Sequence, residues 1–386
     1  MISLDFTSGM VAVRLLTWTV CAIAVVYLSS HDSVVHCAWN MTQGYHLPAW
    51  LVLLPVSLAV SWIVAQIALY FIEIPRVSPQ GKCIFITGCD SGFGHRLADR
   101  MALQGYKVFA GCLFPDGEGA QQLRESGCPD SEGEGGVTIV PCDVTSDKSL
   151  ADAVDLVKKN MTEQQVLWAA VANAGIGSYG YLEWTTPEKV KKLFEVNVFG
   201  AMRTFTAFAP LLRKSKGRFL ITNSFASRFS PPTLIPYSMS KHAALAMCDG
   251  LRAEMAPFGV HVASIEPNMY RTSIVPLTTK ELDIQWESLT EEQRQSYGPK
   301  LLKKARIMTQ DFSYLCQNSL RLPIWCFEHA ITAKFPKDNY QADRTALLIL
   351  DKIVLGLPDE FKALFHNYIH CLLIAARNLL PGRYMP

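Results

Sequence analysis

The stretch from Lys82 to Gly94, Lys-Cys-Ile-Phe-Ile-Thr-Gly-Cys-Asp-Ser-Gly-Phe-Gly, decides the fold of this chain. Its first half is apolar, as in a short buried strand, and it runs directly into a glycine-rich turn. The residues after it predict a helix over 95–104 and a second strand over 107–114. This is the order of a βαβ unit, in which amides of the glycine loop and the helix N-terminus bind a pyrophosphate. The loop residues expected to do so are Gly88, Asp90, Ser91, Gly92, Phe93 and Gly94.

The sequence as far as residue 275 continues to alternate between apolar strands and helical stretches. Strands are expected over 137–142, 166–171, 218–222 and 259–265, and helices over 189–210 and 236–256. Such alternation predicts an α/β fold, a Rossmann-like doubly wound parallel sheet. Ligands bind at the carboxyl ends of the strands in these sheets, and the polar residues at those ends are Asp143, Asn173 and Ser224.

Tyr237 and Lys241 are the residues that carry the expected chemistry. They stand four apart on a predicted helix, so their side chains share one face. An ammonium beside a phenol lowers the pKa of the tyrosine and makes it a proton donor and acceptor near neutral pH. Ser224, thirteen residues upstream at a strand end, is placed to hold a substrate oxygen.

The end of the second strand bears on the choice of cofactor. In dinucleotide-binding folds, an acidic residue about 20 positions after the glycine loop binds the ribose hydroxyls. Asp116 and Glu118 are the candidates here, and the alternative is a ribose held by backbone groups alone. Neither this strand end nor the glycine loop contains an arginine or lysine for a 2′-phosphate. We therefore expect NAD in preference to NADP.

The first 74 residues predict a membrane anchor, an N-terminal transmembrane helical hairpin. Residues 47–72 contain no charged side chain, and a spanning helix needs about 20 residues. Residues 10–30 form a weaker candidate span that contains Arg14. A hairpin of buried helices in a soluble protein is the alternative for 47–72. Residues 75–80, with two prolines, are interpreted as a linker.

The placement of positive charge predicts the orientation of this anchor. Arg14 lies at the start of the first span and Arg76 and Lys82 follow the second, while the connecting residues contain no Lys or Arg. The positive-inside rule then places everything after the anchor in the cytosol. We expect a protein of the endoplasmic reticulum membrane with a cytosolic catalytic domain, and a mitochondrial membrane is the alternative.

The overall composition excludes some classes of function. The chain has 36 Lys and Arg against 34 Asp and Glu, so it lacks the basic field that attracts nucleic acid. Its eleven cysteines include no CxxC pair or Cys/His cluster with metal-ligand spacing, and no metal site is expected. Scattered cysteines in apolar runs are typical of reduced thiols packed in a core.

The motifs as a set resemble those of the short-chain dehydrogenase/reductase family. The matching pieces, in family order, are Thr87-Gly88, Gly92-x-Gly94, Asp143-Val144, Asn173-Ala-Gly175, Asn197, Ser224, Tyr237-x-x-x-Lys241, Glu266-Pro267 and Arg271-Thr272. Residues 86–94 and the apolar N-terminus are similar to the membrane-bound branch of retinol and hydroxysteroid dehydrogenases, such as the type 2 17β-hydroxysteroid dehydrogenases. That branch also contains 3-hydroxybutyrate dehydrogenase. The resemblance implies hydride transfer between an alcohol and a nicotinamide cofactor.

The resemblance also implies roles for individual residues. Asn197, Ser224, Tyr237 and Lys241 would form a catalytic tetrad. Tyr237 would be the acid and base, Lys241 would hold the nicotinamide ribose, and Asn197 would hold a water that relays the proton to solvent. Tyr237 and Lys241 would thus contact the cofactor as well. The other cofactor contacts would be Asp143 at the adenine, Asn173, Gly175, and Thr272 at the carboxamide.

Two positions depart from the family pattern. Ala172 stands where the family has Asn, and Asn268 stands where it has Gly after Pro267. Asn tolerates a left-handed backbone better than most residues, so the second turn is expected to survive. These departures support an alternative of another class, a non-catalytic dinucleotide-binding membrane sensor or scaffold.

A lipophilic small-molecule alcohol or ketone, such as a hydroxysteroid or retinol, is the expected substrate. An apolar pocket beside a bilayer suits such a molecule. The apolar residues expected around the tetrad are Tyr179, Tyr181, Phe225, Phe229, Pro231, Pro232, Leu234 and Ile235. The alternative is a 3-hydroxybutyrate-type hydroxy acid, for which Arg228 is the nearest cation able to bind the carboxylate.

Two parts therefore follow the anchor and linker. Residues 81–275 are expected to form the dinucleotide-binding catalytic domain, and 276–386 a substrate lid and a helical C-terminal extension. Residues 341–380 are apolar with basic interruptions, and no run among them is long enough to span a bilayer. They are interpreted as a helix on the membrane or over the substrate entrance, as a homodimer contact, or as packing against the core.

Overall fold

The computed structural model describes residues 75–126, 135–274 and 279–343, together with Thr19. The chain divides into two units. The first comprises residues 1–78 and 332–336, and its described part includes an antiparallel bridge between Arg76 and Ala333. The second comprises residues 79–331 and 337–386, and it contains the sheet and the candidate site.

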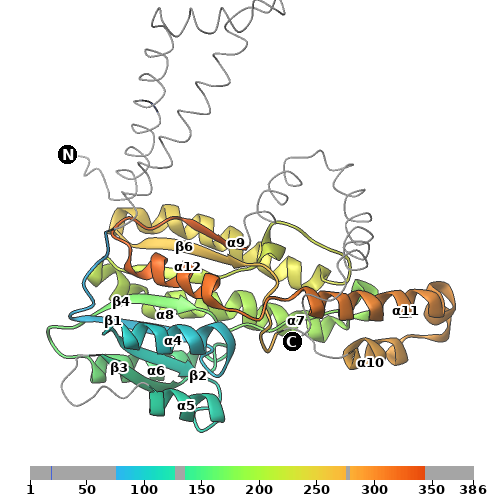
Figure 1. The fold of residues 1–386 in the computed structure, drawn as a ribbon, viewed down its shortest axis with the longest axis horizontal. Helices are drawn as coiled ribbons and strands as arrows, with labels where there is room; N and C mark the ends of the chain where they lie inside the picture. Colours follow the sequence, from blue (N-terminus) through green and yellow to red (C-terminus); the bar gives the residue numbers. More distant parts are fainter. Residues whose placement is uncertain (1–18, 20–74, 127–134, 275–278, 344–386) are drawn as a thin grey trace, which may run out of the picture. The chain divides into compact units, whose positions relative to one another are not determined.

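A seven-stranded parallel sheet forms the centre of the second unit, with strand order β3-β2-β1-β4-β5-β6-β7 (Figure 1). The strands are β1 (Lys82–Thr87), β2 (Lys107–Cys112), β3 (Gly136–Pro141), β4 (Val166–Ala172), β5 (Arg218–Thr222), β6 (His261–Pro267) and β7 (Asn339–Ala342). The strand order reverses between β1 and β4. This confirms the predicted doubly wound α/β sheet, and such a reversal places a ligand at the carboxyl ends of these strands.

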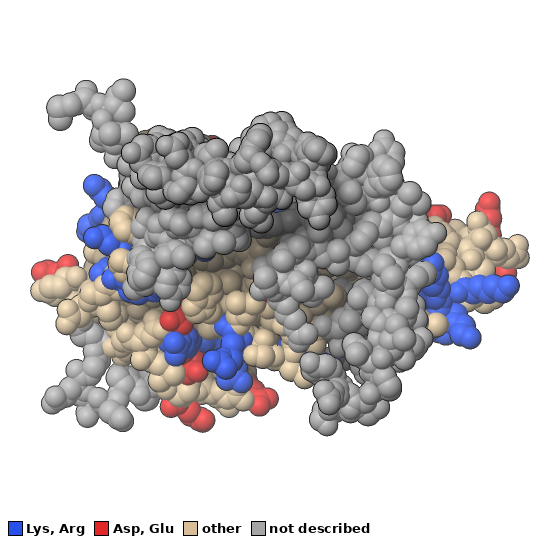
Figure 2. Space-filling view, turned by 45° about the horizontal axis from the view of Figure 1, so that its top comes forward, with Lys and Arg blue, Asp and Glu red and all other residues tan. Residues whose placement is uncertain are grey.

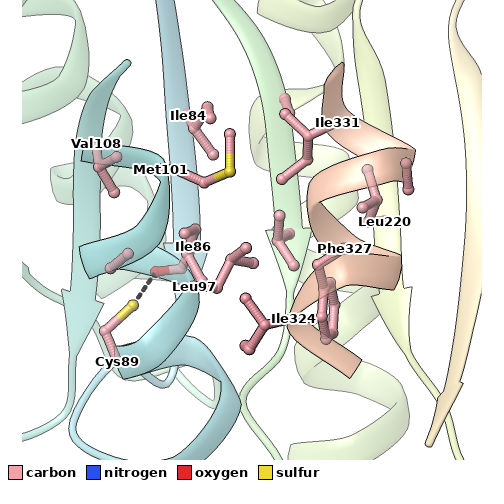
Figure 3. Packing of buried hydrophobic residues seen from close by; sticks show 14 of the residues in the cluster. Ile84, Ile86, Cys89, Leu97, Met101, Val108, Leu220, Ile324, Phe327 and Ile331 are labelled. Carbon is pink, nitrogen blue, oxygen red and sulfur yellow. Dashed lines mark hydrogen bonds between the residues drawn. The ribbon is translucent and has the colours of Figure 1, made fainter. Parts of the chain in front are cut away.

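One face of the sheet is covered by α4 (Gly92–Leu103), α5 (Glu118–Ser126) and α12 (Arg321–Thr332). Figure 3 shows Leu97 of α4 and Phe327 of α12 packed on this face beside Ile86 of β1, and all three are fully buried. Burial of each such side chain stabilises the fold by roughly 1.5–3 kcal/mol. The Cys89 thiol also donates to the carbonyl of Ile86 at 3.2 Å. These contacts fix the two sides of the glycine loop against each other.

The opposite face is covered by α6 (Asp147–Asn160), α8 (Gly200–Ser215) and α9 (Ile235–Met255). Phe208 of α8 stacks on Phe85 of β1 with ring centroids 4.2 Å apart. Pro236 lies in the first turn of α9, where its missing amide hydrogen costs nothing. The buried side of α9 includes Ala244 and Cys248, and this packing holds the helix that carries the predicted catalytic pair.

The structure corrects three predicted element boundaries. The strand predicted over 107–114 ends at Cys112, because the next two amides bond a side chain of the glycine loop. The strand predicted over 259–265 is His261–Pro267, because Gly259 has φ +68° and forms a turn. The helix predicted over 189–210 is α7 (Pro187–Phe194), a π-helical turn (Glu195–Phe199) and α8.

Part of the segment predicted as lid and extension belongs to the sheet instead. Strand β7 pairs with β6, and α12 packs into the core, so residues 321–331 and 339–342 belong to the sheet unit. The strand also occupies the first positions of the segment interpreted as apolar and helical from residue 341. The predicted lid is represented by α10 (Lys280–Ser288) and α11 (Glu291–Leu315), which is kinked at Gly298. Short helical turns lie at Leu182–Trp184, Phe225–Ser227 and Ala256–Phe258.

Among the described residues, no helix is both long and apolar enough to cross a bilayer. The predicted spans 10–30 and 47–72 lie outside the described residues, apart from Thr19, and so does the segment 344–386. Positive and negative side chains are intermingled on the described surface visible in Figure 2, in keeping with a formal net charge of +2. The seven described cysteines are buried and form no disulfide with one another.

Candidate active site

A cavity of about 450 Å³ opens at the carboxyl ends of the central strands. It lies entirely within the second unit. Twelve of the predicted site residues line it: Gly88, Asp90, Ser91, Gly92, Phe93, Asp143, Asn173, Gly175, Ser224, Tyr237, Lys241 and Thr272. Gly94 and Asn197 lie behind its wall. The structure thus brings the predicted cofactor and catalytic residues into one site.

The glycine loop at the end of β1 has room for glycine alone at two positions. Gly88 has φ +69°, which side chains avoid. A Cβ on Gly94 would lie 2.4 Å from the Gly88 carbonyl oxygen and 2.5 Å from Nδ2 of Asn173. That amide donates to the carbonyls of Thr87, at 2.9 Å, and Gly88, at 3.2 Å. Asn173 therefore fastens the end of β4 to the glycine loop.

The N-terminus of α4 meets the requirements of a pyrophosphate site. The helix begins at Gly92, and its N-cap Ser91 makes no side-chain hydrogen bond to the first turn. No acidic residue lies in that turn. The first amides of a helix have no partner within the helix, and its dipole favours an anion there. The residues present at this end of the cavity fit the phosphates of a dinucleotide.

Asp90 occupies the position at the end of β2 where an acidic residue was expected. Its carboxylate accepts from the amide of Leu113 at 3.0 Å and from that of Phe114 at 2.8 Å. Asp90 and Leu113 both line the cavity. The acidic group beside the expected ribose position therefore comes from the glycine loop, where the sequence had placed it among the phosphate-binding residues.

The two acidic residues predicted for the ribose do not line the cavity. The Asp116 side chain is 94% exposed and lies 3.8 Å from Arg124. Glu118, in the first turn of α5, accepts from Gln122 at 3.0 Å. The turn at 114–117, closed by a bond from Gly117 N to Phe114 O, takes both away from the site. The prediction of Asp116 or Glu118 as ribose ligand is therefore not supported.

Asp143 and Thr272, two further predicted contacts, lie in the segments that follow β3 and β6. One oxygen of Asp143 accepts from both the amide and the hydroxyl of Thr145, at 2.9 and 2.7 Å. Thr272 packs on the glycine loop, since a Cβ on Gly92 would lie 3.6 Å from its Cβ. Next to it, the hydroxyls of Ser91 and Ser273 lie 2.9 Å apart. The segment after β6 therefore closes over the loop expected to hold the phosphates.

Ser224, Tyr237 and Lys241 meet at one wall of the cavity. Ser224 follows β5 by two residues and caps a helical turn, where its Oγ accepts from the amide of Ala226 at 3.2 Å. A hydrogen bond joins the Ser224 and Tyr237 side chains. The Lys241 ammonium lies 5.8 Å from the centre of the Tyr237 ring. It donates to the carbonyl of Thr222 at 2.7 Å, which ties α9 to the end of β5.

The pKa values of this pair differ from the expectation. Burial raises the pKa of Tyr237 to about 12, and the hydrogen bond with Ser224 acts in the opposite direction. Burial lowers the pKa of Lys241 to about 8. The predicted lowering of the pKa of Tyr237 by Lys241 is therefore not seen, because desolvation outweighs a cation nearly 6 Å from the ring. Ser224 is the neighbour that favours the phenolate.

Asn197 acts on the cavity wall from behind it. It lies in the π-helical turn Glu195–Phe199, an irregularity common at functional sites. Its Oδ1 accepts from the amide of Ile176 at 2.9 Å, and its Nδ2 donates to the carbonyl of Ile176 at 3.0 Å. Nδ2 also donates to Ser240 Oγ at 3.1 Å. The side chain thus links the loop after β4 to the helix of Tyr237.

The two departures from the family pattern have different consequences. Ala172 ends β4 in the buried core, and the neighbouring Asn173 supplies the bonds to β1. Asn268 lines the cavity and donates to Asp343, while its amide donates to the carbonyl of Ala342 at 3.2 Å. Asn268 is not among the described residues with positive φ, so its turn needs no left-handed backbone. Neither departure disrupts the site.

The substrate side of the cavity is apolar. Of the residues predicted around the tetrad, Tyr179, Phe225 and Leu234 line the cavity, whereas Tyr181, Phe229, Pro231, Pro232 and Ile235 do not. Tyr181 packs instead on Trp184, with ring centroids 4.8 Å apart. Helix α10, in the segment predicted as a lid, is joined to this wall, since Gln285 donates to the carbonyl of Tyr179 at 2.8 Å.

The sequence reasoning missed several residues of the cavity wall. Six of them follow an observed strand by one or two positions, so a systematic reading of strand ends would have found some of them. Met269, Tyr270 and Ile274 follow β6, and their apolar character was the available signal. The missed residues are Leu113, Cys142, Val144, Thr145, Ala174, Ile176, Lys192, Val196, Thr222, Asn223, Pro267, Asn268, Met269, Tyr270, Ser273 and Ile274.

Residues 82–283 match the family described as short chain dehydrogenase, which is more than half of the chain. The chain belongs to the short-chain dehydrogenase family. It is accordingly an oxidoreductase of the NAD(P)-dependent class that acts on CH–OH groups. The sequence-based assignment to this family is confirmed.

Three characterised relatives are similar at comparable identity. The chain is 35% identical over 266 residues to 17-beta-hydroxysteroid dehydrogenase type 6 of Bos taurus, covering 68% of the chain and 81% of the relative. It is 35% identical over 266 residues to Retinol dehydrogenase 16 of Rattus norvegicus, with the same coverage of 68% and 81%. It is 33% identical over 268 residues to the mitochondrial D-beta-hydroxybutyrate dehydrogenase of Rattus norvegicus, covering 67% and 76%.

The fold matches solved structures of bacterial short-chain dehydrogenases. An enzyme of Burkholderia phymatum in complex with NAD superposes with a TM-score of 0.58 at 21% identity, covering 72% of this chain and 93% of that one. An enzyme of Burkholderia cenocepacia in complex with NADP gives 0.52 at 23% identity, covering 75% and 98%. At these identities the likeness establishes the fold alone.

Proposed function

We propose that this protein is a membrane-anchored dehydrogenase that moves a hydride between a lipophilic alcohol, such as a hydroxysteroid or retinol, and NAD. The observation that carries the proposal is the meeting of Ser224, Tyr237 and Lys241 at one wall of a cavity with apolar and aromatic residues on its substrate side. Two of the relatives similar at 35% identity are named for hydroxysteroid and retinol substrates, which supports this class.

Each residue of the tetrad has a task in the proposed reaction. A bound nicotinamide supplies the acceptor for the hydride. In the direction of oxidation, Tyr237 takes the proton of the substrate hydroxyl, and Ser224 holds the substrate oxygen. Ser224 also favours the phenolate by its hydrogen bond, and Lys241 is proposed to hold the nicotinamide ribose. Asn197 fixes the loop at Ile176 and is proposed to hold a water that relays the proton from Lys241.

Asp90 supports NAD over NADP as the cofactor. Its carboxylate lies at the end of β2, where it would repel a 2′-phosphate on the neighbouring ribose. The nearby cation Arg124 donates to the carbonyl of Pro115 at 2.8 Å and pairs with Asp116. Arg124 is held by these contacts with the turn at 114–117 and does not line the cavity. The site therefore offers a negative charge where an NADP enzyme needs a positive one.

The membrane location rests on the sequence. The uncharged stretch 47–72 and the candidate span 10–30 are proposed to hold the protein in the endoplasmic reticulum membrane, with the catalytic domain in the cytosol. A mitochondrial membrane is the alternative, and one relative is named as a mitochondrial enzyme. An anchor of this kind would keep the apolar cavity beside the phase in which a lipophilic alcohol dissolves.

A hydroxy-acid substrate is the second candidate, favoured by the relative named D-beta-hydroxybutyrate dehydrogenase. Arg228, predicted to bind the carboxylate of such a substrate, is held by two hydrogen bonds to Glu266 and does not line the cavity. Lys192 does line it and is the residue to substitute if hydroxy acids prove to be substrates. The engaged Arg228 makes this candidate weaker than the lipophilic alcohol.

A substrate panel tests the proposal. Purified full-length protein in detergent is assayed for reduction of NAD and NADP with hydroxysteroids, retinol and 3-hydroxybutyrate. We expect turnover with NAD and a steroid or retinol. Turnover with 3-hydroxybutyrate alone would replace the substrate class. Tight NADH binding without turnover on any alcohol would instead favour a dinucleotide sensor.

A further inference from the structure

Arg228 and Glu266 form a salt bridge that the proposed mechanism does not use. Nε of Arg228 donates to Oε2 of Glu266 at 2.6 Å, and Nη2 donates to Oε1 at 2.8 Å. The Glu266 side chain is 1% exposed. A carboxylate so fully removed from water needs a paired cation, and the two-pronged guanidinium supplies one in a fixed orientation. The hydrogen bonds with Glu266 raise the pKa of Arg228 above its usual value, so the guanidinium is charged at physiological pH.

Two more hydrogen bonds continue from Glu266 to the residue before Ser224. Ser264 Oγ donates to Oε1 of Glu266 at 3.0 Å, and Asn223 Nδ2 donates to Ser264 Oγ at 2.8 Å. The amide of Asn223 also donates to the carbonyl of Ile265 at 2.7 Å. All of these side chains are buried except that of Arg228. The start of the loop 223–228, called the serine loop below, is thereby fixed to β6.

The other end of the serine loop is fixed by Arg228 itself. Ser224 caps the helical turn Phe225–Ser227, and the amide of Arg228 closes that turn on the carbonyl of Phe225 at 3.1 Å. Ser227 Oγ also donates to the carbonyl of Ser224 at 2.6 Å. Because Arg228 follows the turn directly, its bonds to Glu266 decide where the turn ends. Both ends of the loop 223–228 are therefore connected by hydrogen bonds to the buried carboxylate of Glu266.

We propose that the Arg228–Glu266 pair is a positioning device that holds the Ser224 hydroxyl in place against Tyr237. The inference rests on the proposed function, because it assigns a role within that reaction. If the loop shifts, Tyr237 loses the hydrogen bond that favours its phenolate. Oxidation then requires a higher pH. A salt bridge with only a structural role would alter stability and leave the pH profile unchanged.

The pH readout has to be assigned to Tyr237 among its neighbours. The titratable groups that the structure places around it are Lys241 on its own helix and Tyr179 from the loop after β4. Burial keeps the pKa of Tyr179 far above its usual value, so it stays neutral across the assay range. Lys241, whose pKa is lowered by burial to about 8, donates to the carbonyl of Thr222, which precedes the loop 223–228. A shift seen in the variants therefore reports on Ser224, Tyr237 and Lys241.

The test compares Glu266→Gln and Arg228→Lys with wild-type full-length protein. We expect kcat/KM for the alcohol to fall about tenfold or more in Glu266→Gln and less in Arg228→Lys, which keeps one charged donor. The rising limb of the pH profile should move to higher pH, and NADH affinity should stay within about twofold. The matched control is the surface pair Arg100–Glu328, 2.9 Å apart, where Arg100→Lys and Glu328→Gln should leave all three quantities unchanged.

Hydrogen exchange at residues 223–228 adds a readout that is independent of turnover. Faster exchange together with lower kcat/KM and a shifted pH limb supports the positioning role. The positioning role is overturned if kcat/KM stays within twofold of wild type and the rising pH limb does not move in both variants, whatever the exchange rates show. If Glu266→Gln does not fold, the same criteria apply to Arg228→Lys. A wild-type protein that oxidises no alcohol refutes the proposed function, and this role with it, before any variant is measured.

Discussion

At the scale of single residues, the site is defined by side chains whose charge is set by burial. Lys241 is 4% exposed, and Tyr237 lies one turn away from it on α9. Burial penalises the ammonium and the phenolate alike, so each group favours its neutral form. Deprotonation of Tyr237 during oxidation therefore depends on its neighbours. Mutagenesis should therefore address the hydroxyl of Ser224 and the charge of Lys241.

The lowered pKa of Lys241 predicts how stability changes with pH. The folded protein loses this proton near pH 8 and the unfolded chain near 10.5. Between those values the unfolded state binds more protons, so the contribution of Lys241 to stability rises with pH. Below pH 8 the buried ammonium carries its full desolvation cost. Lys241→Met removes that cost, so its advantage in stability over wild type should be greatest near pH 7 and shrink toward pH 10.

Thermal unfolding of both proteins from pH 7 to 10 measures this difference. Over the whole window the change corresponds to roughly 3 kcal/mol, since one pKa unit is about 1.4 kcal/mol. The comparison cancels the titration of other groups, such as the buried cysteines. A difference in Tm between the two proteins that does not vary with pH would contradict the buried, depressed lysine.

Asp90 predicts the cofactor preference. Asp90→Asn keeps the shape of the side chain but removes the charge beside the expected ribose. We expect kcat/KM with NADP to rise by about 10–100-fold, the size of a unit-charge repulsion at close range near a protein surface. The rate with NAD should change much less. Titration of NADPH fluorescence checks the same change without turnover, and unchanged NADPH affinity would rule out Asp90 as the discriminating residue.

At the scale of elements, the glycine loop tolerates no side chain at Gly94. A Cβ there would meet the Gly88 carbonyl at 2.4 Å, which is backbone that cannot move without opening the loop. Gly94→Ala should therefore weaken NADH binding at least about tenfold, the effect of a 1.4 kcal/mol loss. The control is Gly250→Ala in α9, where a Cβ meets nothing within 4 Å. There alanine should stabilise the helix and leave binding unchanged. Equal NADH affinity in the two variants would contradict the assigned loop.

The elements themselves divide into those the sequence predicts and those it does not. The strands β1 to β6 follow short apolar runs, and their positions along the chain were predicted, whereas their order in the sheet and strand β7 were not. The π-helical turn at Asn197 was not, because its residues have the same helical pattern as those on either side. It forms because the Asn197 side chain bonds both backbone groups of Ile176, a contact between segments 21 residues apart.

The site shows the same division. The glycine loop and the tetrad were predicted because their chemistry is tied to residue type and spacing. The position of Asp90 was not, because its bonds reach across the sheet to Leu113 and Phe114. The pairing of Arg228 with Glu266 joins residues 38 apart in the sequence. In each case the charged residue was recognised in the sequence, but its partner was not, because the two are distant along the chain.

At the scale of the whole molecule, the anchor and the catalytic unit are expected to be separable. Residues 79–331 contain the glycine loop, the tetrad, the lid helices and strands β1 to β6. Deleting residues 1–74 should therefore leave a protein that binds NADH with unchanged affinity. The deletion should also move most of the protein from the membrane fraction to the soluble fraction of expressing cells. A deletion variant that remains in the membrane fraction would show that another segment, such as 344–386, binds the bilayer.

The central claim concerns the whole assembly of cavity, cofactor and tetrad, and deuterium transfer tests it most directly. A hydroxysteroid or retinol deuterated at its carbinol carbon is mixed with NAD and excess full-length protein. The mass of the NADH formed is then measured by mass spectrometry. The account predicts NADH one mass unit heavier with wild type. It predicts almost none with Tyr237→Phe, although that variant still binds NADH. Deuterated NADH formed by Tyr237→Phe at close to the wild-type rate would contradict it.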